Sequence, residues 1–162
     1  MMNSENLVDY LSLLNDVNYD EVYLKQVFQY YHERFIHSDI AQTFLVHEDR
    51  VPEKYIDNPL IGLCDRTLGK YIPTARTFEG GAIRGSLQRC GIIRSSGHEL
   101  FRGCVVFPHF NRDGQIISAT GYRIAERIRY WDKVIVRWKK PKPNDFEKQA
   151  MFIAKELIYG KA

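Results

Sequence analysis

The residues of this chain best suited to bind a ligand are two arginines at the outer ends of a predicted β-hairpin. The stretch 101–123 reads FRGCVVFPHFNRDGQIISATGYR. Cys104 to Phe110 is apolar and β-rich, Asp113-Gly114 is a turn signal, and Gln115 to Ile124 predicts the returning strand. Such a hairpin brings Arg102 and Arg123 together, and paired guanidinium groups suit a polyanion, so nucleic acid is the first partner to consider.

A second cationic stretch follows the hairpin, from Arg123 to Lys142, with aromatic residues interleaved. Cations neutralise phosphates and aromatic faces stack on unpaired bases, which favours a nucleic-acid surface. A solvated strand and turn with buried tryptophans explains the same pattern, and we expect at least one tryptophan to be buried. The cations and aromatic residues of the stretch are Arg123, Arg127, Arg129, Lys133, Arg137, Lys139, Lys140, Lys142, Tyr130, Trp131 and Trp138.

Other chemistry is poorly supported by residue spacing. The run from Gly80 to Gly85 could form an anion-binding nest at a helix start, but it lacks the P-loop and dinucleotide fingerprints, and a turn allowing close packing fits better. The five histidines have no Cys-x-x-Cys partner and no His-Glu-x-x-His helix, so we expect no metal site. Ser95 and Ser96 near His98 lie in a predicted turn with no orienting third group, which does not support a nucleophile triad.

Charge is distributed unevenly along the chain. Residues 1–60 carry 4 Lys/Arg and 11 Asp/Glu, a net charge of −7. Residues 61–142 carry 16 Lys/Arg and 6 Asp/Glu, a net charge of +10, and the whole chain has a net charge of +3. The last twenty residues are balanced, with 3 of each sign. An acidic front beside a basic middle predicts a polarised surface.

Length and composition indicate one globular domain. The chain has 162 residues, of which 44% are hydrophobic and 13% aromatic, enough to build a core. No apolar run approaches the roughly 18 residues of a membrane span, and the polar N-terminus is unlike a secretory signal. The odd number of dispersed cysteines favours a reducing compartment, so we expect a cytoplasmic protein that does not contact membranes.

The acidic front predicts helices. Leu7, Leu11 and Leu14 share a helical face, and a second helix from Asp20 has an apolar stripe at Leu24, Phe28, Tyr31 and Phe35. Further signals predict a third helix capped by Ser38 or Asp39 and a short helix from Pro52 to Ile56.

The remainder mixes short helices with strands. We expect a helix over 82–90 ended by Gly91, a short strand over 92–94, the hairpin, a third strand within 130–138, and a last helix after Asn144. The predicted class is α+β, with a helical N-terminal part packed against a small, largely antiparallel sheet and a closing C-terminal helix. Residues 1–21 are predicted to form a helical extension and residues 22–162 a single domain.

The order of these motifs resembles a known family, the bacterial-type DnaG primases. The most specific part is the hairpin, where FRGCVVFP, Asp113-Gly114 and Gly121-Tyr122-Arg123 resemble the family's Phe-Arg-x-Arg-apolar-apolar-Phe-Pro, Asp-x-x-Gly and Gly-x-Arg. Collinear but weaker matches are YYHERF over 30–35, FLVHEDRVPE over 44–53, LGKYIP over 68–73, SLQRCGII over 86–93, and Phe152 with Lys155 and Tyr159-Gly160. The resemblance runs from about Val22 to Ala162 and corresponds to the basic N-terminal half of the primase catalytic core.

The resemblance implies a groove that guides single-stranded template, lined here by Arg50, Arg102, Arg123 and Lys155. Cys104 stands where the family has a second arginine, which removes one expected phosphate contact. The family's Lys-Tyr-x-Asn-Ser-Pro segment has only an approximate counterpart in residues 137–141.

The resemblance also implies what the chain would need from elsewhere. The family has a zinc ribbon before this region and a metal-binding TOPRIM half after it, and this sequence has neither motif. Phosphoryl transfer needs metal ions held by carboxylates, so we expect no cofactor in this chain, Mg²⁺ or Mn²⁺ only with a TOPRIM half, and no polymerisation by this chain alone.

The leading hypothesis is therefore a primase-like domain that holds single-stranded DNA during replication and primer synthesis. We expect it to work with a TOPRIM-containing protein or a replicative helicase, in a chromosomal, phage or mobile-element system. The nucleic-acid-binding candidates are Arg50, Arg102, Arg123, Arg127, Arg129, Trp138, Lys139 and Lys155. Two alternatives are an active nucleotidyltransferase and an accessory module that binds a protein partner through its acidic front without contacting DNA.

Overall fold

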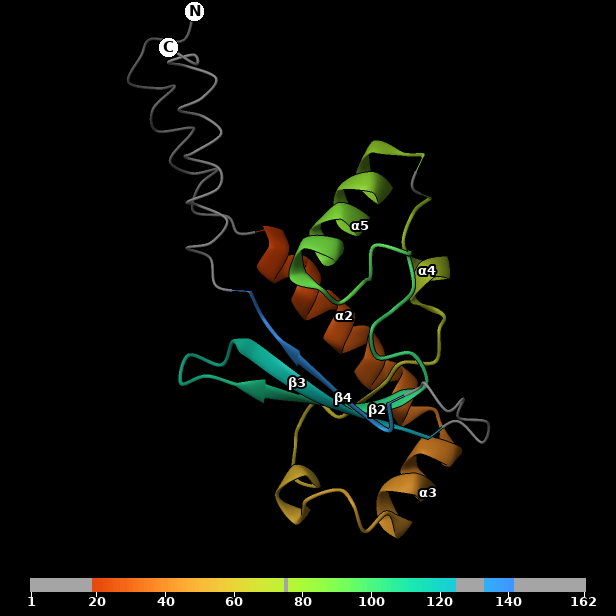
Figure 1. The fold of residues 1–162 in the computed structure, drawn as a ribbon, viewed down its shortest axis with the longest axis vertical. Helices are drawn as coiled ribbons and strands as arrows, with labels where there is room; N and C mark the ends of the chain where they lie inside the picture. The colour runs from red at the N-terminus through yellow and green to blue at the C-terminus, as the bar shows by residue number, and fades with distance from the viewer. Residues whose placement is uncertain (1–18, 75, 125–132, 142–162) are drawn as a thin grey trace, which may run out of the picture.

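The computed structural model describes residues 19–74, 76–124 and 133–141 (Figure 1). The predicted first helix, the predicted last helix and Trp131 lie outside the described residues, so these predictions stay open. The described helices and strands follow the order α2 (Tyr19–Ile36), α3 (Asp39–His47), 3-10 helix η1 (Glu53–Tyr55), β1 (Gly62–Leu63), α4 (Leu68–Tyr71), α5 (Phe78–Cys90), β2 (Cys104–Phe110), β3 (Ile116–Arg123) and β4 (Ile135–Lys139).

The strands form one antiparallel sheet in the order β1-β2-β3-β4, which confirms the predicted α+β class. The β2–β3 hairpin turns through Asn111 to Gln115, and Gly114 adopts a φ of 77° there, as the Asp-Gly signal predicts. The register pairs Cys104 with Arg123 at the open end of the hairpin. β4 pairs with β3 so that Thr120 lies beside Arg137 and Ser118 beside Lys139.

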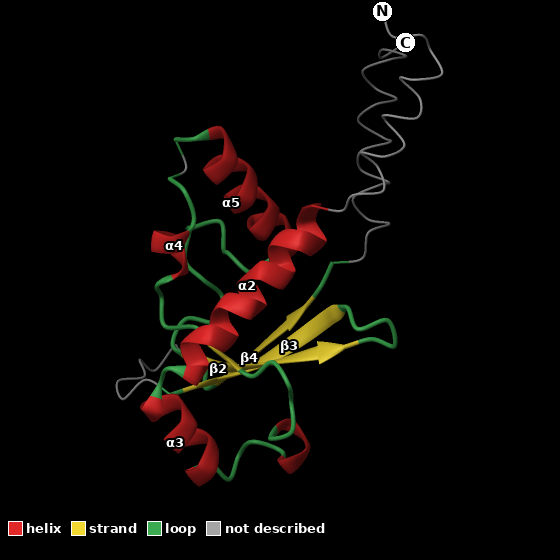
Figure 2. Cartoon of the chain, turned by 180° about the vertical axis from the view of Figure 1, so that it is seen from behind, coloured by secondary structure: helices red, strands yellow, loops and turns green. Residues whose placement is uncertain are grey.

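Alternation along β2 places successive side chains on opposite faces of the sheet, and both faces are covered. Cys104 and Val106 face α2 and α5, within a core that includes Phe28 and Leu87. Val105 and Phe107 face α3 and η1, within a second core that includes Ala41. Figures 1 and 2 show α2 and α3 on opposite sides of the sheet. A strand buried on both faces has a fixed register, because a slip of one residue exchanges the two cores.

The helices of the acidic front are confirmed where the structure describes them. Leu24, Phe28 and Tyr31 of α2 are buried, as their spacing predicts. The hydroxyl of Ser38 accepts a hydrogen bond from the amide of Ala41 at 3.2 Å and caps α3. The predicted short helix after Pro52 is the 3-10 helix η1.

Several elements differ from the sequence prediction. The helix α5 starts at Phe78 rather than at residue 82, because the side chain of Thr77 accepts a hydrogen bond from the amide of Gly80 and caps it. Residues 92–94 are not a strand, since only Ile93 forms a single bridge, with Glu99. The two-residue strand β1 and the one-turn helix α4 are too short to have a periodic sequence signal.

The glycine run at the start of α5 permits close packing. A Cβ atom on Gly80 would overlap the backbone carbonyl oxygens of Pro73 and Thr74, whereas one on Gly85 would meet only Arg89 Nη1 at 3.6 Å. The predicted close packing is therefore present at Gly80, but the predicted turn is wrong, because residues 80–85 lie within α5.

These two glycines give a matched test of the packing. Gly80→Ala should lower the free energy of unfolding by several kcal/mol, because backbone atoms must move apart. Gly85→Ala in the same helix should raise it by about 0.5–1 kcal/mol, because alanine favours a helix interior over glycine. Urea denaturation of both variants measures the difference, and similar values for the two would contradict the packing described here.

Candidate nucleic-acid interface

A cationic pocket lies where the open end of the β2–β3 hairpin meets the start of β4. Its volume is about 430 Å³. Five Arg/Lys side chains and one carboxylate line it, together with one histidine and three apolar residues. The lining residues are Arg94, His98, Glu99, Leu100, Arg102, Arg123, Lys133, Ile135, Val136 and Arg137.

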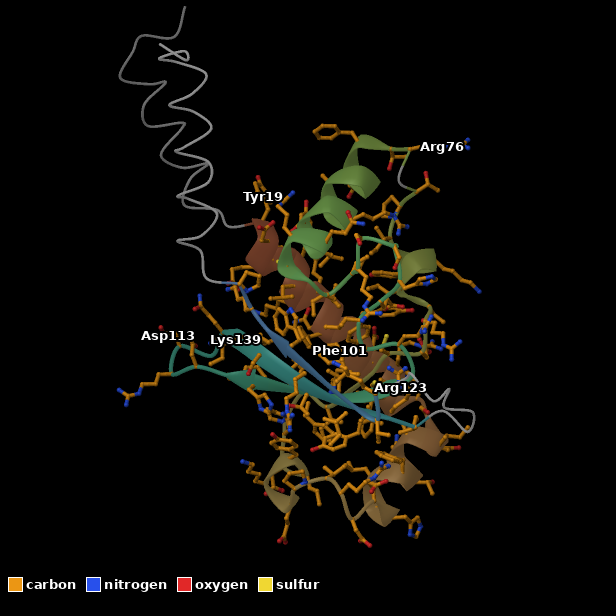
Figure 3. The ribbon with its side chains drawn as sticks, viewed as in Figure 1. Tyr19, Arg76, Phe101, Asp113, Arg123 and Lys139 are labelled. Carbon is orange, nitrogen blue, oxygen red and sulfur yellow. The ribbon has the colours of Figure 1, made fainter. Side chains whose placement is uncertain are left out.

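Hairpin register brings Arg102 and Arg123 to this pocket. Cys104 pairs with Arg123, so Arg102 lies two residues beyond the last pair of β2. Arg123 Nη1 donates to the carbonyl oxygen of Arg102 at 2.6 Å, and Arg123 Nε donates to the carbonyl oxygen of Lys133 at 2.9 Å. Arg123, which is labelled in Figure 3, thus ties together the segments that enter β2 and β4, and it also lines the pocket.

A tight fold-back of residues 92–100 supplies another part of the pocket. The amide of Arg94 donates to the carbonyl of His98 and the amide of Leu100 donates to that of Ile92, both at 2.8 Å. Gly97 adopts a φ of 89° in the turn, a conformation that glycine takes without strain. These bonds hold Arg94 and His98 beside the strands.

Glu99 anchors the fold-back to the core. Its Oε1 atom accepts hydrogen bonds from Tyr31 Oη of α2 at 2.8 Å and from Cys64 Sγ at 3.4 Å. Burial raises the pKa of Glu99 from its ordinary value, although the two donors act in the opposite direction. Burial also raises the pKa values of Tyr31 and Cys64, so both remain protonated donors at neutral pH.

Within the part of the chain that the structure describes, no carboxylate forms an ion pair with the Arg and Lys side chains of the pocket. Among the described residues, the cations in ion pairs are Arg34 with Asp65, Arg50 with Glu48, Arg89 with Asp20 and Lys140 with Glu21. No Arg or Lys that lines the pocket is among them. The described residues therefore give the pocket a net positive charge, which can attract an anion.

The structure does not bring all of the predicted site residues together. Arg50 lies outside the pocket, where its guanidinium pairs with Glu48 at 2.7 and 2.8 Å and holds the pKa of that carboxyl at about 2. Lys139 is exposed at the end of β4 near the hairpin tip, and Figure 3 shows it at the other end of the sheet from Arg123. Arg127, Arg129 and Lys155 lie outside the described residues.

The prediction that Trp138 binds nucleic acid needs a correction, because the structure does not place its ring where a base could stack on it. It is 6% exposed, and its indole Nε1–H donates to the carbonyl oxygen of Cys90 at 2.7 Å. Its ring also packs against Phe28, with 5.7 Å between centroids. The expectation that one tryptophan is buried is confirmed, and Trp138 joins β4 to the end of α5.

Sequence patterns do not single out the other pocket residues. Arg94, His98 and Glu99 belong to a fold-back whose turn is visible in the sequence at Ser95-Ser96-Gly97, but its direction towards the hairpin is not. Lys133 stands out in the sequence only as a member of a basic stretch. Alternation along β4 gives the signal for Arg137, since it lies between the buried Val136 and Trp138 and is exposed.

Metal sites and membrane spans are both lacking in the part of the chain that the structure describes. That part contains no group of three or more His, Cys, Asp or Glu side chains arranged to hold a metal ion. Within the same residues, no helix is both long enough and apolar enough to cross a membrane.

Comparison with known proteins identifies the fold. No protein-family model matches the sequence, and no curated protein matches it. Solved structures do match. The Aquifex aeolicus primase, in a structure of its zinc-binding and RNA polymerase domains, aligns with a TM-score of 0.57, 17% identity, and coverage of 80% of this chain and 31% of that chain. The fold is primase-like.

Two further matches point the same way. The DnaG catalytic core aligns with a TM-score of 0.52, 15% identity, and coverage of 77% of this chain and 38% of that chain. The DnaG primase catalytic domain bound to single-stranded DNA aligns with a TM-score of 0.52, 17% identity, and coverage of 77% and 39%. This chain therefore spans between three and four tenths of the primase structures that it matches. The identities are low, so the primase-like fold is what these matches establish.

The role of Trp138 can be tested in this primase-like fold. Trp138→Phe should lower the free energy of unfolding by about 1–3 kcal/mol, because it leaves the buried carbonyl of Cys90 without its donor. Affinity for single-stranded DNA in the folded variant should stay within about twofold of the unmodified chain. Urea denaturation and fluorescence anisotropy measure the two quantities. A large loss of affinity with unchanged stability would favour stacking on bases instead.

The half-buried carboxyl of Glu99 predicts a pH dependence of stability. Because its pKa is raised in the folded chain, the folded state binds more protons than the unfolded state, and stability falls as pH rises through that pKa. Glu99→Gln should remove this contribution, so the variant should lose less stability than the unmodified chain between about pH 4.5 and 8. Urea denaturation across this range tests the sign, and parallel curves would contradict it.

Proposed function

We propose that this chain is a primase-like domain that holds single-stranded DNA in the pocket around Arg94, Arg102 and Arg123. The observation that carries the proposal is the convergence of five cations, none of them in an ion pair among the described residues, in one pocket of a primase-like fold. Guanidinium groups donate several hydrogen bonds to phosphate oxygens and remain charged at all physiological pH values.

The geometry favours binding through the sugar-phosphate backbone. The cations come from the fold-back, from the hairpin and from the start of β4, so they can contact successive phosphates. Leu100 and Ile135 give the same pocket apolar surface on which a base could rest. Binding of this kind releases counterions and depends strongly on salt.

The similarity to solved structures supports this assignment. One matching structure is a primase catalytic domain bound to single-stranded DNA. We extend that ligand to this chain because the Arg102–Arg123 hairpin, which carries the resemblance in sequence, also forms one wall of the pocket. The role proposed is template holding during DNA replication and primer synthesis.

Primer synthesis itself would need groups from elsewhere. The described residues contain no carboxylate cluster for metal ions, and phosphoryl transfer requires metal ions to stabilise the charge on the reacting phosphate. We therefore propose that a TOPRIM half or a TOPRIM-containing partner supplies the carboxylates with Mg²⁺ or Mn²⁺. This chain would then contribute affinity for the template.

Removing the pocket cations should test the proposed function. Arg94→Ala combined with Arg102→Ala should weaken binding of a labelled single strand about tenfold or more at low salt. It should also reduce the slope of log K against log salt by roughly 0.7 for each phosphate that the variant no longer neutralises. These two side chains make no hydrogen bond to another described residue, so the double variant should keep its stability.

A matched control is Arg112→Ala, which removes an exposed cation at the hairpin tip. It should leave both the affinity and the salt slope close to those of the unmodified chain. Fluorescence anisotropy at several salt concentrations gives both quantities. Absence of binding at low salt, or equal losses in the pocket and control variants, would reject the proposal and favour an accessory module that binds protein.

A further inference from the structure

Among the described residues, Glu99 is the one carboxylate that lines the pocket, beside five Arg and Lys side chains. Its Oε1 atom already accepts from Tyr31 and Cys64, while its Oε2 atom has no hydrogen-bond partner among the described residues. The residue is held firmly, because Tyr31 and Cys64 are 1% and 0% exposed and the backbone of Glu99 forms a bridge with Ile93. A firmly held residue with an unused acceptor therefore lines the pocket.

A carboxylate is unfavourable for a pocket that binds phosphate alone. Its negative charge repels phosphate oxygens and partly cancels the neighbouring guanidinium groups. Its presence is useful if the ligand also carries hydrogen-bond donors. In single-stranded DNA the donors that meet a protein in the interior of the strand belong to the bases.

The bases differ in what they can donate to one carboxylate oxygen. Cytosine, adenine and guanine carry an exocyclic amino group, and carboxylates accept from the N4 amino group of cytosine. Thymine has no amino group, and its ring N–H lies between two carbonyl oxygens that a carboxylate repels. A single free oxygen at a fixed position should therefore distinguish cytosine from thymine.

We propose that Glu99 Oε2 accepts a hydrogen bond from a base amino group and gives the pocket a preference for cytosine over thymine. This inference rests on the proposed function, since it requires that the pocket hold single-stranded DNA. Arg94, Arg102 and Arg123 would hold the backbone irrespective of sequence, and Glu99 would read the base. Glu99 thereby becomes a specificity-determining residue beside its anchoring role.

The two roles of Glu99 lead to different results for Glu99→Gln. The amide oxygen of glutamine can still accept from Tyr31 and Cys64, so the fold-back stays anchored. The amide nitrogen then faces the pocket as a donor, which suits the carbonyl oxygens of thymine and opposes amino groups. If Glu99 acts only as an anchor, the substitution changes stability and leaves the base preference as it was.

The experiment compares labelled ten-nucleotide (dC)10 and (dT)10 by fluorescence anisotropy at about pH 8, where the cytosine strands remain single. The unmodified chain should bind (dC)10 at least about tenfold more tightly, the factor expected for one hydrogen bond to a charged acceptor. Glu99→Gln should abolish or reverse the ratio, mainly by weakening (dC)10. Glu79→Gln, the same change on the exposed start of α5, should leave the ratio unchanged.

A second measurement needs no protein variant. A strand of N4,N4-dimethylcytosine has no amino hydrogens, so the unmodified chain should bind it more weakly than (dC)10 and about as weakly as (dT)10. Equal affinities for (dC)10 and (dT)10, or a preference that survives Glu99→Gln or dimethylation, would overturn the inference while leaving the proposed function intact. Failure to bind either strand at low salt would instead overturn the proposed function.

Discussion

The register of the β2–β3 hairpin is the constraint on which the rest of the structure depends. Both faces of β2 are buried, one against α2 and α5 and the other against α3 and η1. A slip of one residue would exchange the side chains of two cores built from different residues, so only one pairing is compatible with the packing. That pairing sets Cys104 opposite Arg123 and thereby brings the carbonyl of Arg102 within reach of the Arg123 guanidinium.

The same guanidinium connects packing with electrostatics. Arg123 uses two of its nitrogen atoms to hold the carbonyl groups of Arg102 and Lys133, which are acceptors without formal charge. Its positive charge is therefore retained, in contrast to that of Arg50, which Glu48 neutralises locally. A cation held by neutral acceptors is both fixed in position and able to attract phosphate, which is the combination that the proposed function needs.

Burial decides the roles of the groups behind the pocket. Tyr31, Cys64 and Glu99 come from α2, from the residue after β1 and from the fold-back, and they meet through hydrogen bonds whose two donors are buried. This contact fixes the wall that carries Arg94 and His98. The primase-like fold thus fixes the positions of the backbone segments around the pocket. The chemistry of the pocket then depends on which side chains these segments carry.

The sequence by itself determined the elements with strong local signals. Side-chain periodicity predicts the apolar stripe of α2. The backbone conformations that particular residues favour predict the Ser38 cap, the Asp113-Gly114 turn and Gly91 at the end of α5. The meeting of Arg102 and Arg123 was also predictable, because a hairpin with a recognisable turn fixes which residues face each other.

Only the tertiary structure decided which cations share the pocket. Arg50 and Lys139 have the same charge as Arg94 and Lys133, but they lie elsewhere on the molecule because the paths of α3 and β4 carry them away. Trp138 reads equally well as a stacking platform or as core, and the carbonyl of Cys90 at the end of α5 decides for the core. These outcomes depend on contacts between residues far apart in the sequence. Local propensity does not encode such contacts, whereas the packing of two cores against one sheet does.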